Sequence, residues 1–333
     1  VAYALGLLVA GRLIDRIGTR IGYAFSLLGW SIAAMVHALA TAPFGFGMAR
    51  ALLGIFEAGN FPAAIKTTAE WFPKKERALA TGIFNSGANI GAVFAPLLVP
   101  LIAQTLGWQW AFILTGAVGL IWLIFWFIYY EIPEKQKRLS REEHAYILSD
   151  NEPEEKSAVS WASLLKYRQT WAFFTGKFLT DPIWWFYLYW IPGWLAKVQG
   201  VDPKQFSRFG LPLAVIYTAT TIGSISGGWL SSALIRKGWV VHRARATTML
   251  LFACLVVPIM FIQVGGVGFW GAVALVSLAA ASHQAWSANI FTTVSDMFPK
   301  KAVGSVTGIG GMAGAVGGAL IASFTGNVLA FFE

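Results

Sequence analysis

Arg50 and Glu57 are ionisable residues inside a long apolar stretch, and their types and spacing could do chemistry. Seven residues are almost two helical turns, so both side chains share one helix face about 10 Å apart along the axis. An ionisable group at membrane depth costs at least ~3 kcal/mol, so it is usually retained for a function. Burial favours neutral Glu57 and a nearby arginine favours its ionised form, so Glu57 could carry a proton with Arg50 as switching partner. The alternative is a structural charge pair that locks the helix to a neighbour.

Lys177 and Asp181 form a second charged pair, four residues apart and therefore one helical turn apart on the same face. Pro182 removes a backbone donor and disfavours helix at the residue before it, so we expect the helix to kink or open here. Lys177 could contact an anionic ligand. The alternative is a kink that holds an internal salt bridge.

Asn85 and Asn89 lie one turn apart, and Gly87 and Gly91 are expected to leave room beside them. An amide both donates and accepts hydrogen bonds, which suits the hydroxyl groups of a sugar. Hydrogen bonding between helices is the alternative for both asparagines.

The densest polar patch inside any apolar stretch comprises His283, Gln284, Trp286, Ser287 and Asn289. Aromatic faces beside polar groups are typical of sugar-binding sites, so these residues are candidate ligand contacts. His283 could equally be a hydrogen-bonded interior histidine.

The elements that position these residues must be membrane helices. Of the 333 residues, 56% are hydrophobic and 12% are charged, against roughly 25% charged in soluble domains. The basic residues behind the net charge of +9 lie mainly in short connectors, so nucleic-acid binding is not expected. The lone Cys254 and four scattered histidines offer no disulfide or metal site, and no cofactor is expected.

Apolar stretches of membrane-spanning length recur along the chain, after a partial one at its start. They cover roughly 21–41, 45–68, 78–102, 107–130, 169–196, 208–234, 246–264, 268–294 and 303–330. Connectors alternate between strongly basic and nearly uncharged, and the basic side is predicted to be cytoplasmic. The sequence therefore predicts an all-α polytopic membrane protein.

A short motif occurs twice and reveals an internal duplication. Phe72-Pro73-Lys74-Lys75 recurs as Phe298-Pro299-Lys300-Lys301, and Thr81-Gly82-Ile83 recurs at the same offset as Thr307-Gly308-Ile309. We predict two half bundles, residues 1–130 and 169–333, joined by a cytoplasmic loop at 131–168. Parallel duplication of this kind is an architecture of secondary transporters.

The segment Gly11-Arg12-Leu13-Ile14-Asp15-Arg16-Ile17-Gly18-Thr19-Arg20 resembles the signature loop of the major facilitator superfamily. The resemblance implies two pseudo-symmetric six-helix halves, with helices 1 and 12 missing from this chain. It also implies that Gly11, Asp15, Arg16 and Gly18 form a conformational gate loop. Asp15 and the nearby arginines are expected to clamp the cytoplasmic ends of neighbouring helices.

The segment Arg50 to Gly59 resembles the anion:cation symporter family. Two further segments, Phe84-Asn85-Ser86-Gly87-Ala88-Asn89-Ile90-Gly91 and Lys177 to Tyr187, resemble bacterial hexuronate transporters in particular. The resemblance adds Tyr3 to the candidate substrate contacts. It implies proton-coupled uptake of galacturonate or glucuronate by a monomer in the bacterial inner membrane, with substrate held between the halves.

Other functions stay open beside this expectation. The substrate could be another sugar acid or organic anion, such as galactonate or glucarate. A membrane-embedded enzyme would need paired acids, a nucleophile beside a base, or a metal cluster, and the intramembrane acids are isolated. A receptor fits duplicated halves less well than a transporter does, and no Walker motif suggests ATP-driven transport.

Overall fold

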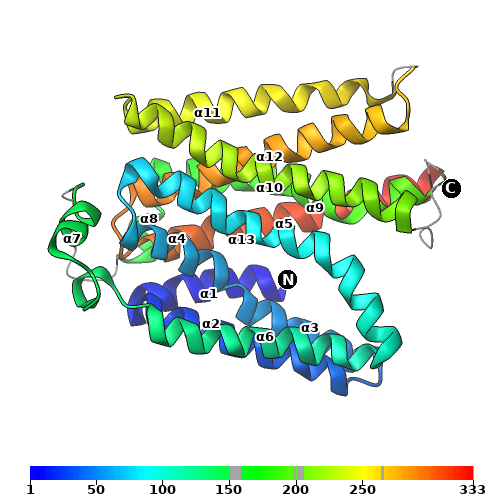
Figure 1. Ribbon diagram of the computed structural model, residues 1–333, viewed down its shortest axis with the longest axis horizontal. Coiled ribbons are helices and arrows are strands. Elements are labelled where there is room, and N and C mark those ends of the chain that lie inside the picture. The colour runs from blue at the N-terminus through cyan, green and yellow to red at the C-terminus, as the bar shows by residue number, and fades with distance from the viewer. Residues whose placement is uncertain (151–158, 198–199, 201–205, 264–265, 333) are drawn as a thin grey trace. The chain divides into compact units, whose positions relative to one another are not determined.

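The computed structural model describes residues 1–150, 159–197, 200, 206–263 and 266–332. All regular structure in these ranges is helical, as Figure 1 shows, which confirms the predicted all-α class. Residues 151–158 of the expected loop at 131–168 lie outside the described ranges. The helices are α1 (Ala2–Ile17), α2 (Thr19–Val36), α3 (Pro43–Glu57), α4 (Asn60–Trp71), α5 (Lys74–Thr105), α6 (Trp108–Tyr129), α7 (Arg141–Ile147), α8 (Trp161–Leu164), α9 (Arg168–Lys197), α10 (Phe206–Arg236), α11 (Val241–Val256), α12 (Phe269–Met297) and α13 (Val303–Phe332), with short 3₁₀ segments at His37–Leu39, Pro133–Lys135 and Val257–Gln263.

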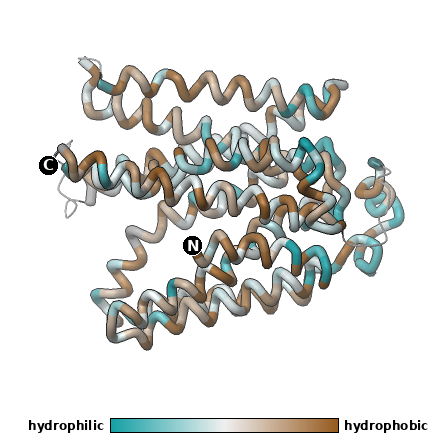
Figure 2. The backbone as a smooth tube through the Cα atoms, turned by 180° about the vertical axis from the view of Figure 1, so that it is seen from behind, coloured by the Kyte–Doolittle hydropathy of each residue, from teal (hydrophilic) through white to brown (hydrophobic). Residues whose placement is uncertain are grey.

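Six described segments are long and apolar enough to cross a membrane. They are Thr19–Leu39, Lys74–Ala95, Trp108–Tyr129, Phe209–Arg236, Val241–Gln263 and Val303–Phe331. The hydropathy colouring in Figure 2 shows brown along most helices and teal concentrated around α7 and at helix ends. Helices α9 and α12, at 30 and 29 residues, are also long, and they carry several of the polar candidate residues.

The segment expected to be one span at 45–68 is two helices, which corrects that prediction. Helix α3 ends at Glu57 and α4 begins at Asn60. Between them, buried Gly59 lies so close to Ser26 of α2 that a side chain at this position would collide with the serine hydroxyl. The close contact with α2 thus coincides with the break, and it places Glu57 at a helix end.

Of the two possibilities expected at Pro182, a kink or an opening, the opening does not occur, because α9 continues as helix through this residue. Pro182 has no backbone N–H group to donate to the carbonyl of Phe178, one turn earlier in the helix. That carbonyl and the Pro182 ring lie against Gly317 of α13, where a Cβ would be 2.5 Å from the Phe178 oxygen. A glycine at this position lets α13 cover the proline site closely, and packing of this kind lets membrane helices tolerate proline.

The chain divides into two compact units. Unit 1 comprises Val1–Lys74, Leu97–Lys177 and Val294–Val316, and unit 2 comprises Lys75–Pro96, Phe178–Thr293 and Gly317–Glu333. Helices α5, α9, α12 and α13 are each divided between the two units. The predicted division of the chain at 131–168 stays a prediction.

In unit 1, helix α2 packs against both α3 and α6, and α1 packs against α3. Aromatic residues join α2 to the end of α6: Tyr23 meets Trp126 edge-on at 5.0 Å, and Trp126 stacks on Tyr130 at 3.8 Å. The Trp126 indole also donates a hydrogen bond to the carbonyl of Arg20. These contacts fix the helices that carry Arg50, Glu57 and the gate loop.

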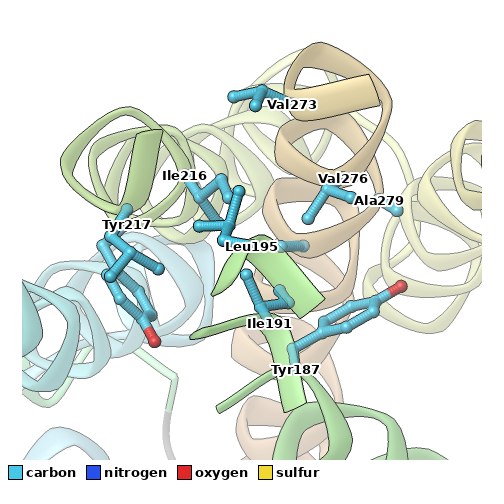
Figure 3. Packing of buried hydrophobic residues seen from close by; sticks show 10 residues of the cluster. Tyr187, Ile191, Leu195, Ile216, Tyr217, Val273, Val276 and Ala279 are labelled. Atoms are coloured by element: carbon cyan, nitrogen blue, oxygen red, sulfur yellow. The ribbon is translucent and has the colours of Figure 1, made fainter. Parts of the chain in front are cut away.

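In unit 2, an apolar core joins α9, α10 and α12, as Figure 3 shows. Tyr187, Ile191 and Leu195 extend from α9 toward Ile216 of α10 and Val276 of α12. This core anchors one end of each helix. The polar candidate residues lie further along the same helices.

The internal duplication is visible in the packing of each unit. In unit 1, Gly11 of α1 approaches the backbone of Gly304 of α13 too closely for a Cβ. In unit 2, Gly228 of α10 approaches the backbone of Ala78 of α5 in the same way. Since Ala78 and Gly304 are equivalent positions of the sequence repeat, the two units contain the same helix crossing.

Candidate functional site

The charged pair of α3 lies on a face that the rest of the chain leaves exposed. Arg50 and Glu57 are both exposed, and the positive charge of Arg50 acts on the Glu57 carboxylate. Since α3 ends at Glu57 and α4 begins at Asn60, the Glu57 carboxylate lies at a helix end and not in the middle of a continuous helix. Broken helices at membrane depth are where transporters place their ligand and ion sites. Sequence reasoning found the pair but missed the break, which Gly59 could have indicated.

Tyr3 lies on the neighbouring helix of the same unit. The backbone of Tyr3 would be 3.2 Å from a Cβ at Gly54, which lies between Arg50 and Glu57 on α3. The close α1–α3 contact therefore brings half-buried Tyr3 to the level of the charged pair. The structure thus gathers three of the candidate residues on two adjacent helices.

Lys177 and Asp181 differ in their exposure. Lys177 is only 2% exposed, whereas Asp181 is half-buried. Lys177 belongs to unit 1 and Asp181 to unit 2. A ligand carboxylate could reach a lysine this buried only after the surrounding side chains move.

Asn85 ties three helices of unit 2 together. Its amide donates to Ser224 Oγ of α10 at 3.0 Å and to Gln284 Oε1 of α12 at 2.8 Å. The Ser224 hydroxyl in turn donates to the carbonyl of Gly82 at 2.9 Å. Both donors of Asn85 are therefore used, which favours the interhelical role that the sequence left open.

Asn89, one turn further along α5, has a different environment. It is 1% exposed, and neither its amide nitrogen nor its oxygen has a hydrogen-bond partner in the described part of the chain. Leaving a buried amide unpaired costs about 1–3 kcal/mol per group, so native proteins rarely do so without a water or ligand. Asn89 is the amide whose hydrogen bonds remain available to a ligand.

The glycines near these asparagines correct a sequence expectation. A Cβ on Gly87 or Gly91 would meet nothing within 4 Å, and both residues are exposed. Because they sit two residues from the asparagines, they lie on the opposite face of the helix. They do not make room beside Asn85 and Asn89.

Within the polar patch of α12, His283 and Asn289 form hydrogen bonds with backbone carbonyls of other helices. His283 Nε2 lies 2.8 Å from the carbonyl of Thr180, so this nitrogen carries the proton. The His283 ring also stacks on Trp184 of α9, with 6.2 Å between centroids. Asn289 donates to the carbonyls of Gly227 and Ala285, while its buried oxygen has no partner among the described residues.

Trp286 and Ser287 lie on the same helix. Trp286 is half-buried and Ser287 is 7% exposed. An indole that is only partly covered can still offer its face to a sugar ring. These side chains and Asn89 belong to unit 2 and remain suited to contact a polar ligand.

The predicted gate loop is organised around Asp15. Its carboxylate accepts hydrogen bonds from the backbone N–H groups of Gly304 at 3.1 Å and Ser305 at 2.6 Å, in the first turn of α13. An acidic group at a helix N-terminus is favoured by the helix dipole. Gly18 ends α1 with φ of 88°, a conformation that favours glycine, and Arg16 is exposed.

Lys66, which sequence reasoning did not select, is the ion-pair partner of Asp15. Its Nζ lies 3.0 Å from Asp15 Oδ1 and also donates to the carbonyl of Ile14. Lys66 is 4% exposed, so it is a buried structural partner and not a side chain at the membrane interface. A lysine from α4 thus joins Asp15 in holding the helix ends together.

A second carboxylate on α4 is also held by neighbouring helices. Glu70 accepts hydrogen bonds from Thr19 at 2.7 Å and from the Tyr130 hydroxyl at 2.5 Å. The sequence repeat indicated this position, because Glu70 matches Asp296 of the second copy. Among the described residues, no group of three histidine, cysteine or acidic side chains could hold a metal ion.

Known proteins resemble this chain along almost its whole length. The hexuronate transporter of Escherichia coli strain K12 is 33% identical over 98% of this chain and 76% of its own length. The galacturonate transporter of Dickeya chrysanthemi is 37% identical over 67% of this chain and 65% of that protein. The D-galactonate transporter of Escherichia coli O6:H1 is 29% identical, over 95% and 75% respectively.

Solved structures agree on the fold. The human organic anion transporter MFSD10 matches with a TM-score of 0.70 at 16% identity, over 96% of this chain and 73% of that one. The Escherichia coli fucose:proton symporter FucP matches with a TM-score of 0.68 at 14% identity, over 98% and 82%. The family model of the Major Facilitator Superfamily matches residues 1–322. The chain therefore belongs to the major facilitator superfamily and is a multi-pass membrane transporter.

Proposed function

We propose that this transporter carries hexuronates such as galacturonate and glucuronate into a bacterial cell together with protons. The observation that carries the proposal is the 33% identity to a hexuronate transporter across 98% of the chain, together with the Arg50–Glu57 pair in the exposed face of α3. The protein would lie in the inner membrane as a monomer and work by alternating access.

Each unit contributes its own proposed roles. In unit 1, Glu57 loads and releases the proton, and Arg50 is its switching partner or binds the substrate carboxylate. Tyr3 and Lys177 are further proposed substrate contacts, with Lys177 facing the carboxylate. Because proton and substrate must jointly shift the equilibrium between inward-facing and outward-facing states, the Glu57 charge has to respond to the substrate.

In unit 2, the proposed sugar contacts start with Asn89, whose buried amide lacks partners among the described residues. Hydroxyl groups donate and accept hydrogen bonds, so they would satisfy both amide atoms of this residue. Trp286, Ser287 and His283 would extend the contact along α12. Asn85 and Asn289 would hold the helices in place around them. Asp181 would contribute the negative charge of its carboxylate to the site.

The Asp15 contacts are proposed to be the gate that stabilises one of the two states. A carboxylate that binds the first turn of α13 and a lysine of α4 holds three helices together. Breaking these contacts would let the basic ends of α1 and α13 separate. Gly11 permits the close crossing that the gate needs, and Gly18 and Arg16 complete the loop.

A related substrate is favoured by another observation. Relatives at 28–29% identity are named as D-galactonate and probable galactarate/D-glucarate transporters. These substrates are also sugar acids, and galactarate and glucarate carry two carboxylates instead of one. The hexuronate proposal predicts a preference for sugar acids with one carboxylate. The galactarate or glucarate alternative predicts a preference for sugar acids with two.

Uptake by the reconstituted full chain tests the assignment. Proteoliposomes would be supplied with labelled galacturonate, and unlabelled galacturonate, glucuronate, galactonate and galactarate would compete at equal concentrations. We expect galacturonate and glucuronate to block uptake at several-fold lower concentration than galactonate or galactarate. Strongest competition by galactonate or galactarate would remove the hexuronate assignment while leaving sugar-acid transport in place.

A further inference from the structure

An apolar cavity of about 300 Å³ opens on the side of unit 1 and is separate from every residue discussed as a substrate contact. Most of its lining side chains are apolar, and they come from α1, α8, α9 and α13 and the turn between α8 and α9. The lining residues are Leu8, Trp161, Leu165, Thr170, Trp171, Phe174, Ile309 and Met312. A volume at the lower end of the range for ligand pockets is enough for part of an elongated apolar ligand.

The wall formed by α8 and the start of α9 is fixed by hydrogen bonds. The Thr170 hydroxyl donates to the carbonyl of Leu164 at 2.7 Å. The Trp171 indole donates to the carbonyl of Leu165 at 2.8 Å. The turn between the two helices is therefore held in shape, and the cavity is a preformed groove instead of a gap between loose side chains.

Basic residues flank the groove-lining residues in the sequence, on the predicted cytoplasmic side. Along α1, Leu8 and Arg12 are one turn apart on one face, so the helix changes from apolar to basic at the groove. Arg12 also donates to the carbonyl of Val159, just before α8. Lys166 and Arg168, both exposed, follow the groove-lining Leu165. The acidic residues Glu152, Glu154 and Glu155 lie outside the described residues.

The indole of Trp161 adds an unused hydrogen-bond donor. Its N–H is buried beside the groove and has no partner among the described residues. Tryptophan is enriched where membrane helices meet the headgroup region. An ester or phosphate oxygen of a lipid could accept this donor after a small movement of the ring.

We propose that the groove binds one acyl chain of an anionic phospholipid from the cytoplasmic leaflet. The chain would fill the apolar cavity, and the headgroup phosphate would lie near Arg12, Lys166 and Arg168. Charge complementarity selects this occupant, because basic pockets between membrane helices on the cytoplasmic side bind anionic headgroups. The proposal does not depend on the identity of the transported substrate.

Bromine quenching tests the proposal directly, since bromine on an acyl chain quenches tryptophan fluorescence only at close range. The protein would be placed in phosphatidylcholine vesicles that contain a small fraction of phosphatidylglycerol or phosphatidylcholine with brominated chains. The signal of Trp161 is the difference between the unmodified protein and Trp161→Phe. We expect brominated phosphatidylglycerol to quench it at least threefold more than brominated phosphatidylcholine at equal fraction.

Two variants locate the effect. Lys166→Gln with Arg168→Gln should abolish the preference for phosphatidylglycerol. The matched control, Arg236→Gln with Lys237→Gln, removes the same charge from exposed residues at the end of α10 and should leave the preference intact. Met312→Phe, which narrows the groove without adding a tryptophan, should lower quenching by both lipids while transport continues.

The outcomes separate the possible occupants. Equal quenching by the two brominated lipids would overturn the proposal, since the groove would then hold bulk lipid without selection. Absence of quenching by either lipid would overturn it too, because a part of the protein or a second copy would cover the groove. Loss of the preference in the control variant would show a general charge effect and would equally contradict a local site.

Discussion

The carboxylate of Asp15 on α1 accepts the backbone N–H of Ser305 on α13 at 2.6 Å, although 290 residues separate them. The same carboxylate binds Lys66 of α4 at 3.0 Å, and its side chain is fully buried. One side chain thus joins three helices at the end that carries the basic connectors. In the other copy of the repeat, α5 begins at Lys74, directly after Pro73, whereas α13 begins only at Val303. The later start of α13 leaves the N–H groups of its first turn for Asp15 to accept.

Removing the Asp15 charge should destabilise the protein strongly. Asp15→Asn leaves the Lys66 ammonium buried without a counter-charge, and breaking a buried pair on one side costs about 3–5 kcal/mol. Thermal unfolding in detergent would measure the loss. Asp15→Asn with Lys66→Met should recover part of it, because no unpaired charge remains.

The control for this prediction is the partly exposed ion pair between Arg20 and Glu131, whose side chains are 37% and 26% exposed. Glu131→Gln removes a charge from a pair that water reaches, so the expected loss is smaller, about 1 kcal/mol. If Lys66→Met lowered the stability of Asp15→Asn still further, the buried pair would not be the source of the effect.

The crossing of α1 and α13 should not tolerate a methyl group at Gly11. A Cβ there would overlap the carbonyl oxygen of Gly304, and backbone atoms cannot rotate away. We expect Gly11→Ala to cost about 1–3 kcal/mol through overpacking and to reduce transport. Gly87→Ala is the matched control, because a Cβ at that position meets nothing within 4 Å.

Unfolding temperature and uptake, measured on both glycine variants, check this prediction. Gly87→Ala should be neutral in both measurements. Equal behaviour of the two variants would mean that α1 and α13 do not cross at Gly11 in the membrane.

The two asparagines of α5 should separate stability from substrate binding. Asn85→Leu removes the partner of Ser224 and Gln284 and should lower the unfolding free energy by about 1–3 kcal/mol. Asn89→Leu removes an amide without partners among the described residues. It should leave stability unchanged or raised, yet increase the KM for sugar-acid uptake about tenfold or more.

The same two assays, unfolding and concentration-dependent uptake, decide between the roles. A destabilised Asn89→Leu with normal KM would assign Asn89 to helix packing and remove it from the substrate contacts. Asn85→Leu serves as the internal comparison, since it makes the same chemical change one turn away.

Much of the fold could be predicted from the sequence because the membrane imposes it. Long apolar stretches must become helices when no water is present to pair the backbone. Paired motifs such as Thr81-Gly82 and Thr307-Gly308 then revealed the duplication, which the crossings at Gly228 and Gly11 now display in each unit.

Other features depend on contacts between segments distant in the chain, which a local pattern does not contain. The break after Glu57 coincides with the approach of Gly59 to Ser26. The continuity of α9 through Pro182 depends on Gly317, far along the sequence. The partnership of Lys66 with Asp15 is of this kind, because only the folded chain brings the two side chains together.

For the candidate site, the sequence indicated suitable residue types but not which of these side chains form hydrogen bonds with other helices. Asn85 and Asn89 have the same chemistry and similar neighbours in sequence. Only the positions of Ser224 and Gln284 show that Asn85 is tied between helices. Residues that bind a ligand and residues that bind other helices are chosen by the same rules, so periodicity alone does not separate them.

The measurement that tests the central claim most directly compares Glu57→Gln with the unmodified protein in proteoliposomes. Galacturonate accumulation would be driven by an inward proton gradient, and galacturonate exchange would be measured without a gradient. The account predicts that Glu57→Gln, which resembles the protonated acid, loses gradient-driven accumulation but retains exchange. Gradient-driven accumulation at the normal level in Glu57→Gln would contradict the account, because the proton would then be carried elsewhere.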